Sequence, residues 1–553
     1  MKETIIILGA GVMQSPAIKI AKELGYFAIA LDGNKDAPCV SMADRFEHID
    51  LKEKESIETF ARSLLNKTRR LGIMTAGTDF SASVAWTAEK LGLPGIPYEA
   101  ALNACDKSRM RECFKKAALP SPAFITVTGD GWDAPETGLF AEGGFAAGRP
   151  LVVKPVDNMG SRGCRLVNSA DELPQAVKTA VSFSRSGRAI IEEYMEGSEF
   201  SVDAVIYGGE ITICGLADRH IFFPPYFIEM GHTIPAVIEK ENRNALLEVF
   251  CAGVRALGIA GEKSVGAAKG DIKLTPNGAM IGEIAARLSG GYMSGWTYPA
   301  SSGVLPIKAA VQMAMGQKPD GLEPVKHWTC AERAFISIPG TVKEIENINE
   351  KGEEACGIFT LIKPGSKVTF PENNVTKCGN IIASAPERET AVKAAEDAAK
   401  SILIRLDPAD KKTEYFLLAG AAGCAAGCAA FPPDAFKLTE EQKAALLKLP
   451  DSFNLFSGSS LPSISFSGCA LFPFPIFTES SLTDYMGRTV KESLDAVRYL
   501  TGLPLPAAFK NAENKLILDR SFWQAFIRGG YQGAVYYIDR LENHIEKKRR
   551  SSF

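Results

Sequence analysis

The sequence lacks three features that would place it at once in a special class of protein. Its net charge is only −3, from 62 Lys and Arg against 65 Asp and Glu, which argues against a general nucleic-acid binder. No apolar run reaches the roughly 20 residues that a membrane helix needs, since the stretch 416–431 is shorter and rich in Gly and Ala. The 12 cysteines are scattered, so we expect no disulfide framework.

A secretion signal is missing as well. Met1-Lys2-Glu3-Thr4 leads directly into an apolar strand and carries an acid early, unlike a signal or transit peptide. We therefore expect a cytoplasmic protein with reduced thiols. Cys424 and Cys428 have no second cysteine pair or spaced histidines nearby, so we interpret them as small buried side chains rather than zinc ligands.

The composition is that of an ordinary globular protein. The 553 residues are 46% hydrophobic and 23% charged, which predicts about three or four domains. Over residues 1–104, apolar β-branched runs alternate with helical stretches. The predicted strands are 4–11, 27–32 and 72–76, and the predicted helices are about 56–70 and 81–92. Alternating βαβ units predict a parallel sheet with helices on both faces, a Rossmann-like domain.

The middle of the chain changes character. Asp106 is placed to cap a helix over 107–118, and the turn sequence at 207–210 predicts an antiparallel hairpin. We predict an α+β domain over 105–325, with a lid subdomain at about 120–200. A strand-rich domain follows over 326–410 and ends in a helix over 387–405. The other predicted strands are 151–154, 189–194, 200–207, 210–217, 265–274 and 279–285, and the predicted helices are 171–183 and 241–257.

A lysine followed by a glycine-rich loop is the first candidate site. Lys154 ends an apolar strand, and the loop 158–163, Asn-Met-Gly-Ser-Arg-Gly, follows it. A fixed cation beside the backbone N–H groups of such a loop suits the oxygens of a triphosphate. The alternative is an ordinary hairpin with glycines for turning. The spacing does not match a P-loop, because no Gly-Lys-Ser/Thr ends the loop.

Two further stretches point to the same ligand. Residues 190–200 predict two strands joined by a hinge whose backbone can read an adenine edge, with Glu199 accepting from ribose hydroxyls. Asp271 and Glu283 lie on two predicted antiparallel strands, where they can face each other and offer hard oxygen ligands to Mg²⁺. Taken alone, acidic hinge residues are usually just solvated, and the two acids equally fit edge strands in water.

In this order, the elements resemble the ATP-grasp superfamily, and within it the L-amino-acid-ligase-like carboxylate–amine ligases, over about residues 1–405. Biotin carboxylase and D-alanine–D-alanine ligase are more distant likenesses. The resemblance implies an ATP-grasp fold of mixed α/β and α+β class, with an N-terminal Rossmann-like domain, a strand-rich third domain and a C-terminal extension. It also implies ATP and Mg²⁺ or Mn²⁺ as ligands.

The resemblance assigns site residues in four groups. They are, for the ATP phosphates, Lys107, Lys154 and the lid residues Gly160, Ser161, Arg162 and Gly163; for adenine and ribose, Glu192, Glu193, Met195 and Glu199; for Mg²⁺, Asp271 and Glu283; and for catalysis, Arg287, His232 and Arg219. By this likeness Arg287 holds a substrate carboxylate beside Gly290-Gly291. His232 approaches the transferred phosphate or the tetrahedral intermediate.

Two positions depart from the family pattern. The family usually has Asn two residues after the second metal acid, where this chain has Ala285, so one metal ligand is missing or replaced by water. An asparagine introduced there would supply it. Arg219 stands where many members carry a lysine that contacts phosphate. Its planar guanidinium group still supplies a positive charge, but in place of the compact ammonium group of a lysine.

The implied reaction joins a small carboxylic acid to an amine, both expected to be amino acids. ATP converts the carboxylate to an acylphosphate, because oxide is a poor leaving group, and the amine then attacks to form an amide or peptide bond. ADP and phosphate are the other products. The protein neutralises charge and excludes water from the intermediate.

Three other interpretations remain. Gly9-Ala10-Gly11 with Asp32 resembles a dinucleotide fingerprint, although Gln14 holds the place of the third glycine. The main rival enzyme is a carboxylase of the biotin carboxylase or purine-biosynthetic type that uses bicarbonate. A degenerate ATP-binding protein is the third, on the grounds of Ala285 and the unmatched C-terminal segment.

That segment, residues 411–553, is interpreted as a separately packed accessory extension of unknown role. It holds Pro-, Phe- and Ser-rich sequence at 450–477 and predicted helices near 487–501 and 520–547. Its aromatic residues are numerous enough to bury a face against the enzyme or a second subunit, as in a homodimer. We expect a chain that ends near Asp410 to keep nearly unchanged ATP affinity but to be less soluble, or altered in its oligomeric state or in the acceptor it uses.

Overall fold

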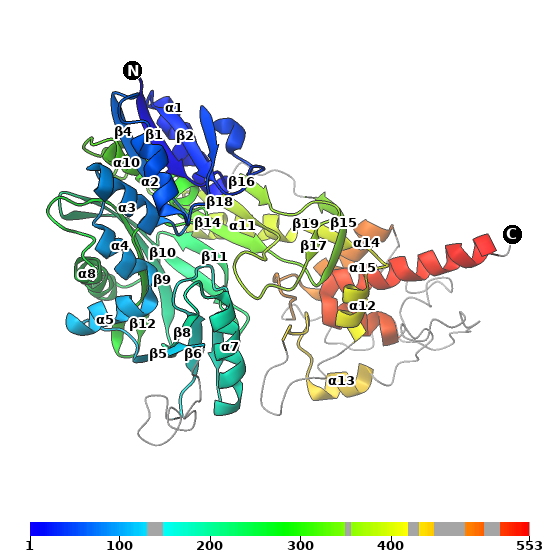
Figure 1. Cartoon of the computed structure of the whole chain (residues 1–553). Coiled ribbons are helices and arrows are strands. Elements are labelled where there is room, and N and C mark those ends of the chain that lie inside the picture. Colours follow the sequence, from blue (N-terminus) through cyan, green and yellow to red (C-terminus); the bar gives the residue numbers. More distant parts are fainter. Residues whose placement is uncertain (130–147, 349–354, 419–430, 447–481, 503–519, 552–553) are drawn as a thin grey trace. The chain divides into compact units, whose positions relative to one another are not determined.

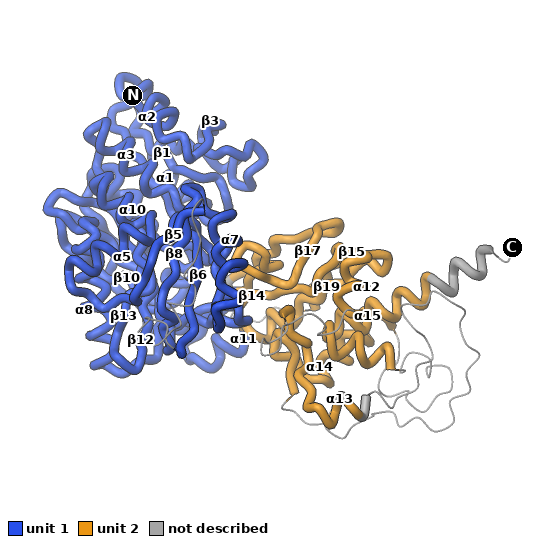
Figure 2. Tube along the Cα trace, turned by 60° about the horizontal axis from the view of Figure 1, so that its bottom comes forward, with its two compact units in different colours: residues 1–332, 382–394 blue, residues 333–381, 395–553 orange. Residues whose placement is uncertain are grey.

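The computed structural model describes residues 1–129, 148–348, 355–418, 431–446, 482–502 and 520–551 (Figure 1). The chain divides into two compact units, which Figure 2 colours separately. Unit 1 comprises residues 1–332 and 382–394, and unit 2 comprises residues 333–381 and 395–553. Within the described ranges, every helix is too short or too polar to span a bilayer.

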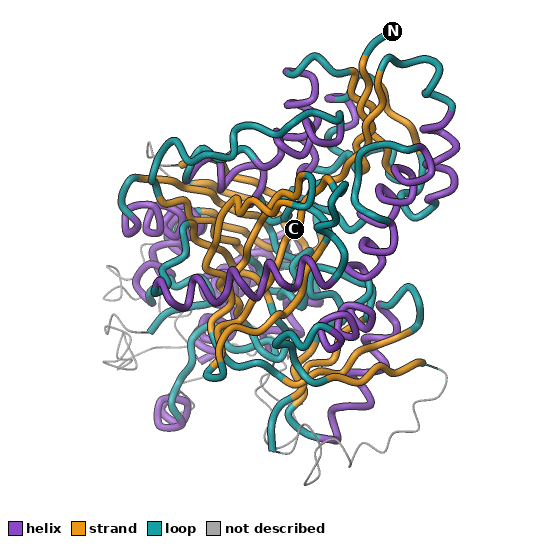
Figure 3. The backbone as a smooth tube through the Cα atoms, turned by 90° about the vertical axis from the view of Figure 1, so that its left-hand side faces the viewer, coloured by secondary structure: helices purple, strands orange, loops and turns teal. Residues whose placement is uncertain are grey.

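Unit 1 begins with a four-stranded parallel sheet flanked by helices (Figure 3). Its elements are β1 (Glu3–Leu8), α1 (Ser15–Glu23), β2 (Phe27–Asp32), β3 (Arg45–His48), α2 (Lys54–Arg62), β4 (Arg70–Thr75), α3 (Ser81–Leu91), α4 (Tyr98–Cys105) and, from later in the chain, α9 (Tyr298–Ser301) and α10 (Pro306–Ala314). Ile5 and Ile7 of β1 pack with α1 and α10, whereas Ile6 and Leu8 pack with α2 and α3. Burial on both faces explains why the strand is continuously apolar, and the predicted parallel sheet is confirmed.

A second, antiparallel sheet forms the lid region. Its strands, in order, are β5 (Phe124–Thr128), β8 (Arg188–Glu193), β6 (Leu151–Pro155) and β7 (Arg165–Val167), and α7 (Leu173–Phe183) packs on one face. Val153 faces α7, so Lys154, the next residue, points to the opposite face. Asp106 caps the preceding helix α5 (Lys107–Lys116) as predicted, since its carboxylate accepts from the N–H groups of Ser108 and Arg109.

The central sheet carries most of the charged residues that the sequence analysis assigns to the candidate site. It has eight strands, and the five that carry these residues are, in order and each antiparallel to its neighbour, β13 (Gly278–Ala285), β12 (Val265–Thr275), β9 (Ser198–Tyr207), β10 (Glu210–Phe222) and β11 (Ile228–Ile234). The order continues with β14 (Thr329–Phe335), β18 (Gly379–Ala385) and β16 (Ala355–Thr360). One face is apolar, where Val202, Ala204 and Ile272 pack with Phe250 of α8 (Lys240–Ala256). The predicted strands here are confirmed, and β11, which carries His232, is an additional strand that the sequence does not predict.

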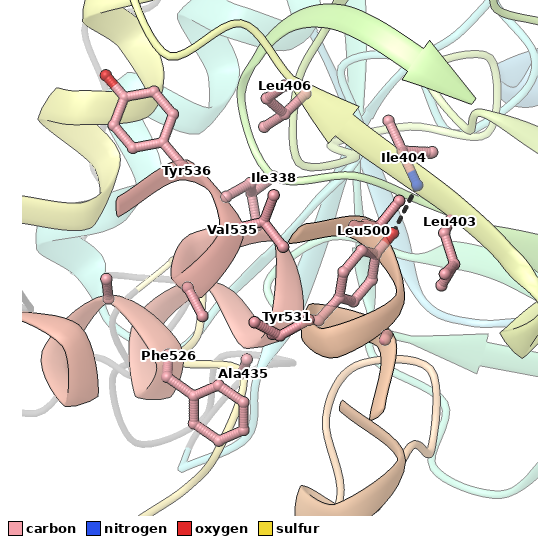
Figure 4. Packing of buried hydrophobic residues seen from close by; sticks show 14 of the residues in the cluster. Ile338, Leu403, Ile404, Leu406, Ala435, Leu500, Phe526, Tyr531, Val535 and Tyr536 are labelled. Carbon is pink, nitrogen blue, oxygen red and sulfur yellow. Dashed lines mark hydrogen bonds between the residues drawn. The ribbon is translucent and has the colours of Figure 1, made fainter. Parts of the chain in front are cut away.

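Unit 2 is built around one hydrophobic core. Its elements are β15 (Gly340–Asn347), β16 (Ala355–Thr360), β17 (Lys367–Val368), β19 (Ile402–Leu406), α12 (Lys411–Leu418), α13 (Glu440–Leu446), α14 (Val490–Thr501) and α15 (Arg520–Ser551). In Figure 4, side chains of β19 lie against those of α15, and the hydroxyl of Tyr531 accepts from the N–H of Ile404 at 2.7 Å. Residue 410 therefore divides two segments of one compact unit.

One predicted element is wrong. The expected helix over 387–405 is helix α11 (Arg388–Lys400) followed by strand β19, which pairs with β15. Residues 402–404 are an apolar run of Ile, Leu and Ile, all buried, and such a run suits a strand better than the last turn of a helix. The stretch 450–477 and the pair Cys424 and Cys428 lie outside the described residues.

The shared core changes the expected result of truncation. A chain that ends at Asp410 loses the buried rings of Phe522, Trp523 and Phe526, and each large ring removed from a core costs about 3–5 kcal/mol. We expect residues 333–406 to become sensitive to limited proteolysis in this truncate. A chain that ends at residue 543 keeps those rings and serves as the control; equal protease resistance in both would contradict the shared core.

Candidate active site

Strand alternation gathers charged side chains on one face of the central sheet. Successive residues of a strand point to opposite faces, and direct cross-strand partners share a face. The residues on the charged face are Glu199, Ser201 and Asp203 of β9, Ala217 and Arg219 of β10, Lys269, Asp271 and Lys273 of β12, and Glu283 and Ala285 of β13. Most of the residues that the sequence singled out for nucleotide and metal binding in this sheet therefore lie together.

Asp271 and Glu283 face each other, because they are direct partners in the pairing of β12 with β13. The Lys107 Nζ atom lies 3.3 Å from Oε1 of Glu283. Burial alone would raise the pKa of Glu283, but the positive charges of Lys107, Lys154 and Lys269 outweigh it and hold the pKa at about 2. Glu283 is therefore an anion throughout the neutral pH range.

Asp271 has a cation on each carboxylate oxygen. Arg219 Nη1 lies 2.7 Å from Oδ1, and the Lys269 Nζ atom pairs with Oδ2. Lys269 precedes Asp271 by two residues on β12, so the strand itself places it on the same face. The acid pair is thus neutralised by fixed cations of the chain.

Arg219 joins three carboxylates at once. Its guanidinium pairs with Glu199, with Asp271, and with Oε2 of Glu229 at 2.5 Å. Burial opposes its charge, but the three carboxylates raise its pKa well above the usual value. A planar fork can contact several acids in fixed directions, which a lysine point charge does less well. The arginine at this position therefore ties the predicted ribose acid to the predicted metal acid.

Glu192 is a buried anion and not a solvated hinge acid, and its place beside adenine stays a prediction. It is only 2% exposed; Arg111 Nε lies 2.8 Å from Oε1 and Lys154 Nζ lies 2.6 Å from Oε2. Burial would raise the pKa of Glu192, but Arg111 and Lys154 lower it below the usual value. Both oxygens of this carboxylate are paired with cations, so Glu192 positions Lys154.

The rest of the hinge lies around Lys273. Its Nζ atom donates to the carbonyl of Met195 at 3.0 Å, lies 5.0 Å above the ring of Tyr194 and is 3.7 Å from Glu199. Glu193, by contrast, pairs with Arg149 at 2.6 Å on the protein surface. Met195 and Glu199 therefore lie beside the charged face of the central sheet, whereas the side chain of Glu193 is paired on the protein surface.

The predicted glycine-rich loop lies beside Lys107. Lys107 Nζ donates to the carbonyl of Asn158 at 2.9 Å. Gly160, Ser161 and Gly163 have φ angles of 68°, 59° and 70°, and the backbone N–H groups of turns that contain left-handed residues can form concave sites that bind anions. The Arg162 Nε atom donates to the Met159 carbonyl at 3.0 Å, so this side chain folds back over its own loop.

The side chain of Arg287 has one N–H group without a hydrogen-bond partner. Its Nε atom is buried and has no hydrogen-bond partner among the described residues, while Nη1 donates to the carbonyl of Leu288 at 3.2 Å. The loop that follows lies close to Gly77: the N–H of Gly77 donates to the carbonyl of Leu288, and a Cβ atom at Gly290 would lie 3.2 Å from the carbonyl oxygen of Gly77, a tight contact. Buried donors without partners are rare in native proteins, and among the described residues the Nε atoms of Arg165 and Arg219 share this state with that of Arg287. The role of Arg287 toward a substrate carboxylate stays a prediction.

His232 is fully buried rather than exposed to a substrate. Its Nδ1 atom lies 3.2 Å from Oε2 of Glu332, and Nε2 is 3.0 Å from the hydroxyl of Thr297. Thr297 ends a π-helical turn over Met293–Thr297 that follows the Arg287 loop. In this structure His232 ties strand β11 to that turn, and its contact with a transferred phosphate stays a prediction.

The facing acids fit a hard divalent cation such as Mg²⁺. Carboxylate oxygens are its usual protein ligands, and two acids this close are stable only with positive charge nearby. Among the described residues, no group of three or more His, Cys, Asp and Glu side chains could hold a metal ion by itself. An ion between Asp271 and Glu283 therefore needs further oxygens, which nucleotide phosphates can supply.

The glycine turn after β1 does not resemble a dinucleotide site in its contacts. The N–H of Gly11 donates to Oε1 of Gln14 at 3.0 Å, and the N–H of Ala10 donates to Asp32 at 2.8 Å. The Gln14 side chain is buried and fills the space above Gly9. The N–H groups that would face a pyrophosphate are used within the protein.

Five residues of the site are not predicted by the sequence reasoning, namely Arg111, Glu229, Lys269, Lys273 and Glu332. Lys269 and Lys273 had a readable signal, because each lies two residues from a predicted metal acid on one strand. The others come from separate elements whose contacts only the tertiary fold determines.

Two adjacent glutamates offer a matched stability test. Glu192→Gln removes the ionic partner of the buried Arg111. Breaking a buried ion pair in this way lowers the free energy of unfolding by about 3–5 kcal/mol. Glu193→Gln breaks a surface pair, which costs less than about 1 kcal/mol. Urea unfolding of both variants measures the difference; equal losses would show that the buried triad does not exist in solution.

The chain matches two known domain families. The ATP-grasp domain matches residues 147–294, and L-amino acid ligase C-terminal domain 2 matches residues 334–407. The chain is similar to carnosine synthase 1 from Gallus gallus, with 25% identity over 335 residues, 58% of this chain and 36% of that relative. It thus spans well under half the length of this relative.

Solved structures with the same fold include two informative ones. An L-amino acid ligase from Bacillus licheniformis has a TM-score of 0.61 and 21% identity, covering 74% of this chain and 100% of that one. The biotin carboxylase domain of the 2-oxoglutarate carboxylase from Hydrogenobacter thermophilus, solved with MgADP, ADP and bicarbonate, has a TM-score of 0.56 and 18% identity. It covers 73% of this chain and 91% of that one. At these identities the likeness is one of fold.

Proposed function

We infer that this chain, which belongs to the ATP-grasp superfamily and resembles its L-amino acid ligases, is an ATP-dependent carboxylate–amine ligase. It joins a small carboxylic acid and an amine, both of them amino acids, and converts ATP to ADP and phosphate. The observation that carries the proposal is the placement of Arg287, four residues after the metal acid Glu283, with a buried Nε donor that has no partner among the described residues.

The chain's own residues account for the first step, in which ATP activates the acid. Lys154, held by Glu192, and Lys107, beside the glycine-rich loop, face the ATP phosphates and offset their charge. Arg287 holds the substrate carboxylate, one oxygen of which attacks the γ-phosphorus while the bond to ADP breaks. Mg²⁺, held by Asp271 and Glu283, supplies further neutralisation of phosphate charge when bound.

In the second step the amine attacks the acyl carbon of the acylphosphate. The carbon–oxygen bond to phosphate breaks, the amine loses a proton, and an amide bond results. In this proposal Arg287 and the Gly290-Gly291 backbone hold the carbonyl oxygen of the intermediate. The loop 158–163 closes over the acylphosphate and keeps water away from it. On the grounds of its sequence we place the enzyme in the cytoplasm and propose a homodimer.

The test is ATP consumption with defined substrates. The full chain is incubated with ATP, Mg²⁺ and pairs of amino acids, while phosphate release is followed and products are identified by mass spectrometry. A dipeptide or amide that appears with stoichiometric phosphate supports the proposal. Phosphate release that depends on bicarbonate instead would favour the carboxylase, and ATP binding without turnover on any acid would favour a degenerate ATP-binding protein.

A further inference from the structure

Lys269 is a cation built into the acid pair. It is ion-paired with Oδ2 of Asp271 and is 15% exposed. Its direct partner on β13 is Ala285, whose methyl group offers no ligand atom. Its partner on β9, Asp203, is fully buried and accepts a hydrogen bond from the N–H of Ser289 at 2.8 Å. Asp271 is therefore the carboxylate that this ammonium group neutralises.

Each of the two acids is in direct contact with a different lysine. Lys107 contacts Glu283 and Lys269 contacts Asp271, while the charge of Lys269 also acts on Glu283 from farther away. An ammonium group is a compact point charge with three donors and no acceptor, so it can offset phosphate charge but cannot ligate a metal ion. A second metal ion in contact with Oδ2 of Asp271 would meet this fixed positive charge at short range, and like charges that close repel strongly.

The geometry points to a site that takes one divalent cation per bound nucleotide, with the ammonium group of Lys269 in the place of a second ion. This inference rests on the proposed function, because the two carboxylates alone offer too few ligands and the ion must enter with the nucleotide phosphates. Because the ammonium group of Lys269 takes the place of the second ion, the position opposite it, Ala285, does not have to supply an oxygen ligand.

The experiment counts metal ions, not turnover. The full chain is saturated with a non-hydrolysable ATP analogue and titrated with Mn²⁺ to millimolar free concentration, and the Mn²⁺ and nucleotide retained after ultrafiltration are both measured. We expect a Mn²⁺ to nucleotide ratio of one for the natural sequence and for Ala285→Asn, since Lys269 remains in the latter. We expect the ratio to approach two in Lys269→Ala/Ala285→Asn, which removes the cation and adds an oxygen ligand.

Lys263 provides a control. It is exposed in the turn before β12, away from the residues of the charged face. The variant Lys263→Ala/Ala285→Asn should keep a ratio of one. A ratio of two in the natural sequence or in Ala285→Asn, or a ratio of one in the folded Lys269→Ala/Ala285→Asn variant, overturns the inference while leaving the proposed function intact. A natural chain that retains no nucleotide overturns both.

Discussion

Lys154→Met is expected to weaken ATP binding about 10- to 150-fold. The lysine is held by Glu192 at 2.6 Å on the lid face away from α7. A charge-assisted contact to a phosphate contributes about 1.5–3 kcal/mol, and each 1.4 kcal/mol is a factor of about ten in affinity. Titration with a fluorescent ATP analogue measures the loss.

The control for this variant is Lys178→Met. Lys178 is exposed on α7, on the other face of the lid sheet, so its loss should leave ATP affinity unchanged. Because Lys154→Met also removes a partner of Glu192, thermal unfolding of the ligand-free variant must first show that it is folded. Unchanged ATP affinity in a folded Lys154→Met protein would remove Lys154 from the phosphate site.

Glu283→Gln is expected to lower ATP turnover at least about 100-fold while the protein stays folded. The amide keeps the shape of the side chain but loses the anion that a divalent cation requires, and a metal ion contributes several kcal/mol of transition-state stabilisation. Some loss of stability is expected as well, because the nearly buried Lys107 loses an anionic partner, so thermal unfolding must first show that the variant is folded. Phosphate release at saturating Mg²⁺ measures the effect.

The matched control is Glu262→Gln, in the exposed turn before β12, which should retain full turnover. Thermal melts of both variants separate a fold defect from a catalytic one. Retained Mg²⁺-dependent turnover in Glu283→Gln would show that Glu283 is not a metal ligand.

The register of the acid pair was readable from the sequence for a physical reason. A strand repeats every two residues, so two apolar runs joined by a short turn set which residues face each other, and Asp271 does lie opposite Glu283. The parallel first sheet was readable in the same way, because a strand buried on both faces must be continuously apolar.

What could not be read were contacts between residues far apart in the chain. Glu192 looks like a solvated hinge acid in the sequence, and only the approach of Arg111 from α5 makes it a buried anion. His232 likewise carries no local sign that Glu332, 100 residues later, lies beside it. The predicted helix over 387–405 was wrong in its last turn, because the local sequence of residues 402–404 fits a helix or a strand. The pairing of these residues with β15 makes them a strand.

The discontinuous make-up of unit 1 has a consequence for synthesis. Unit 1 consists of residues 1–332 and 382–394, so it is incomplete until residue 394 has left the ribosome. By then strands β15 and β17 have already emerged, and their core still lacks the rings of α15, among them Trp523 and Tyr531. Domains generally fold as they emerge, and exposed apolar strands invite aggregation. We therefore expect strands β15 and β17 of the nascent chain to need protection by a chaperone until α15 has emerged.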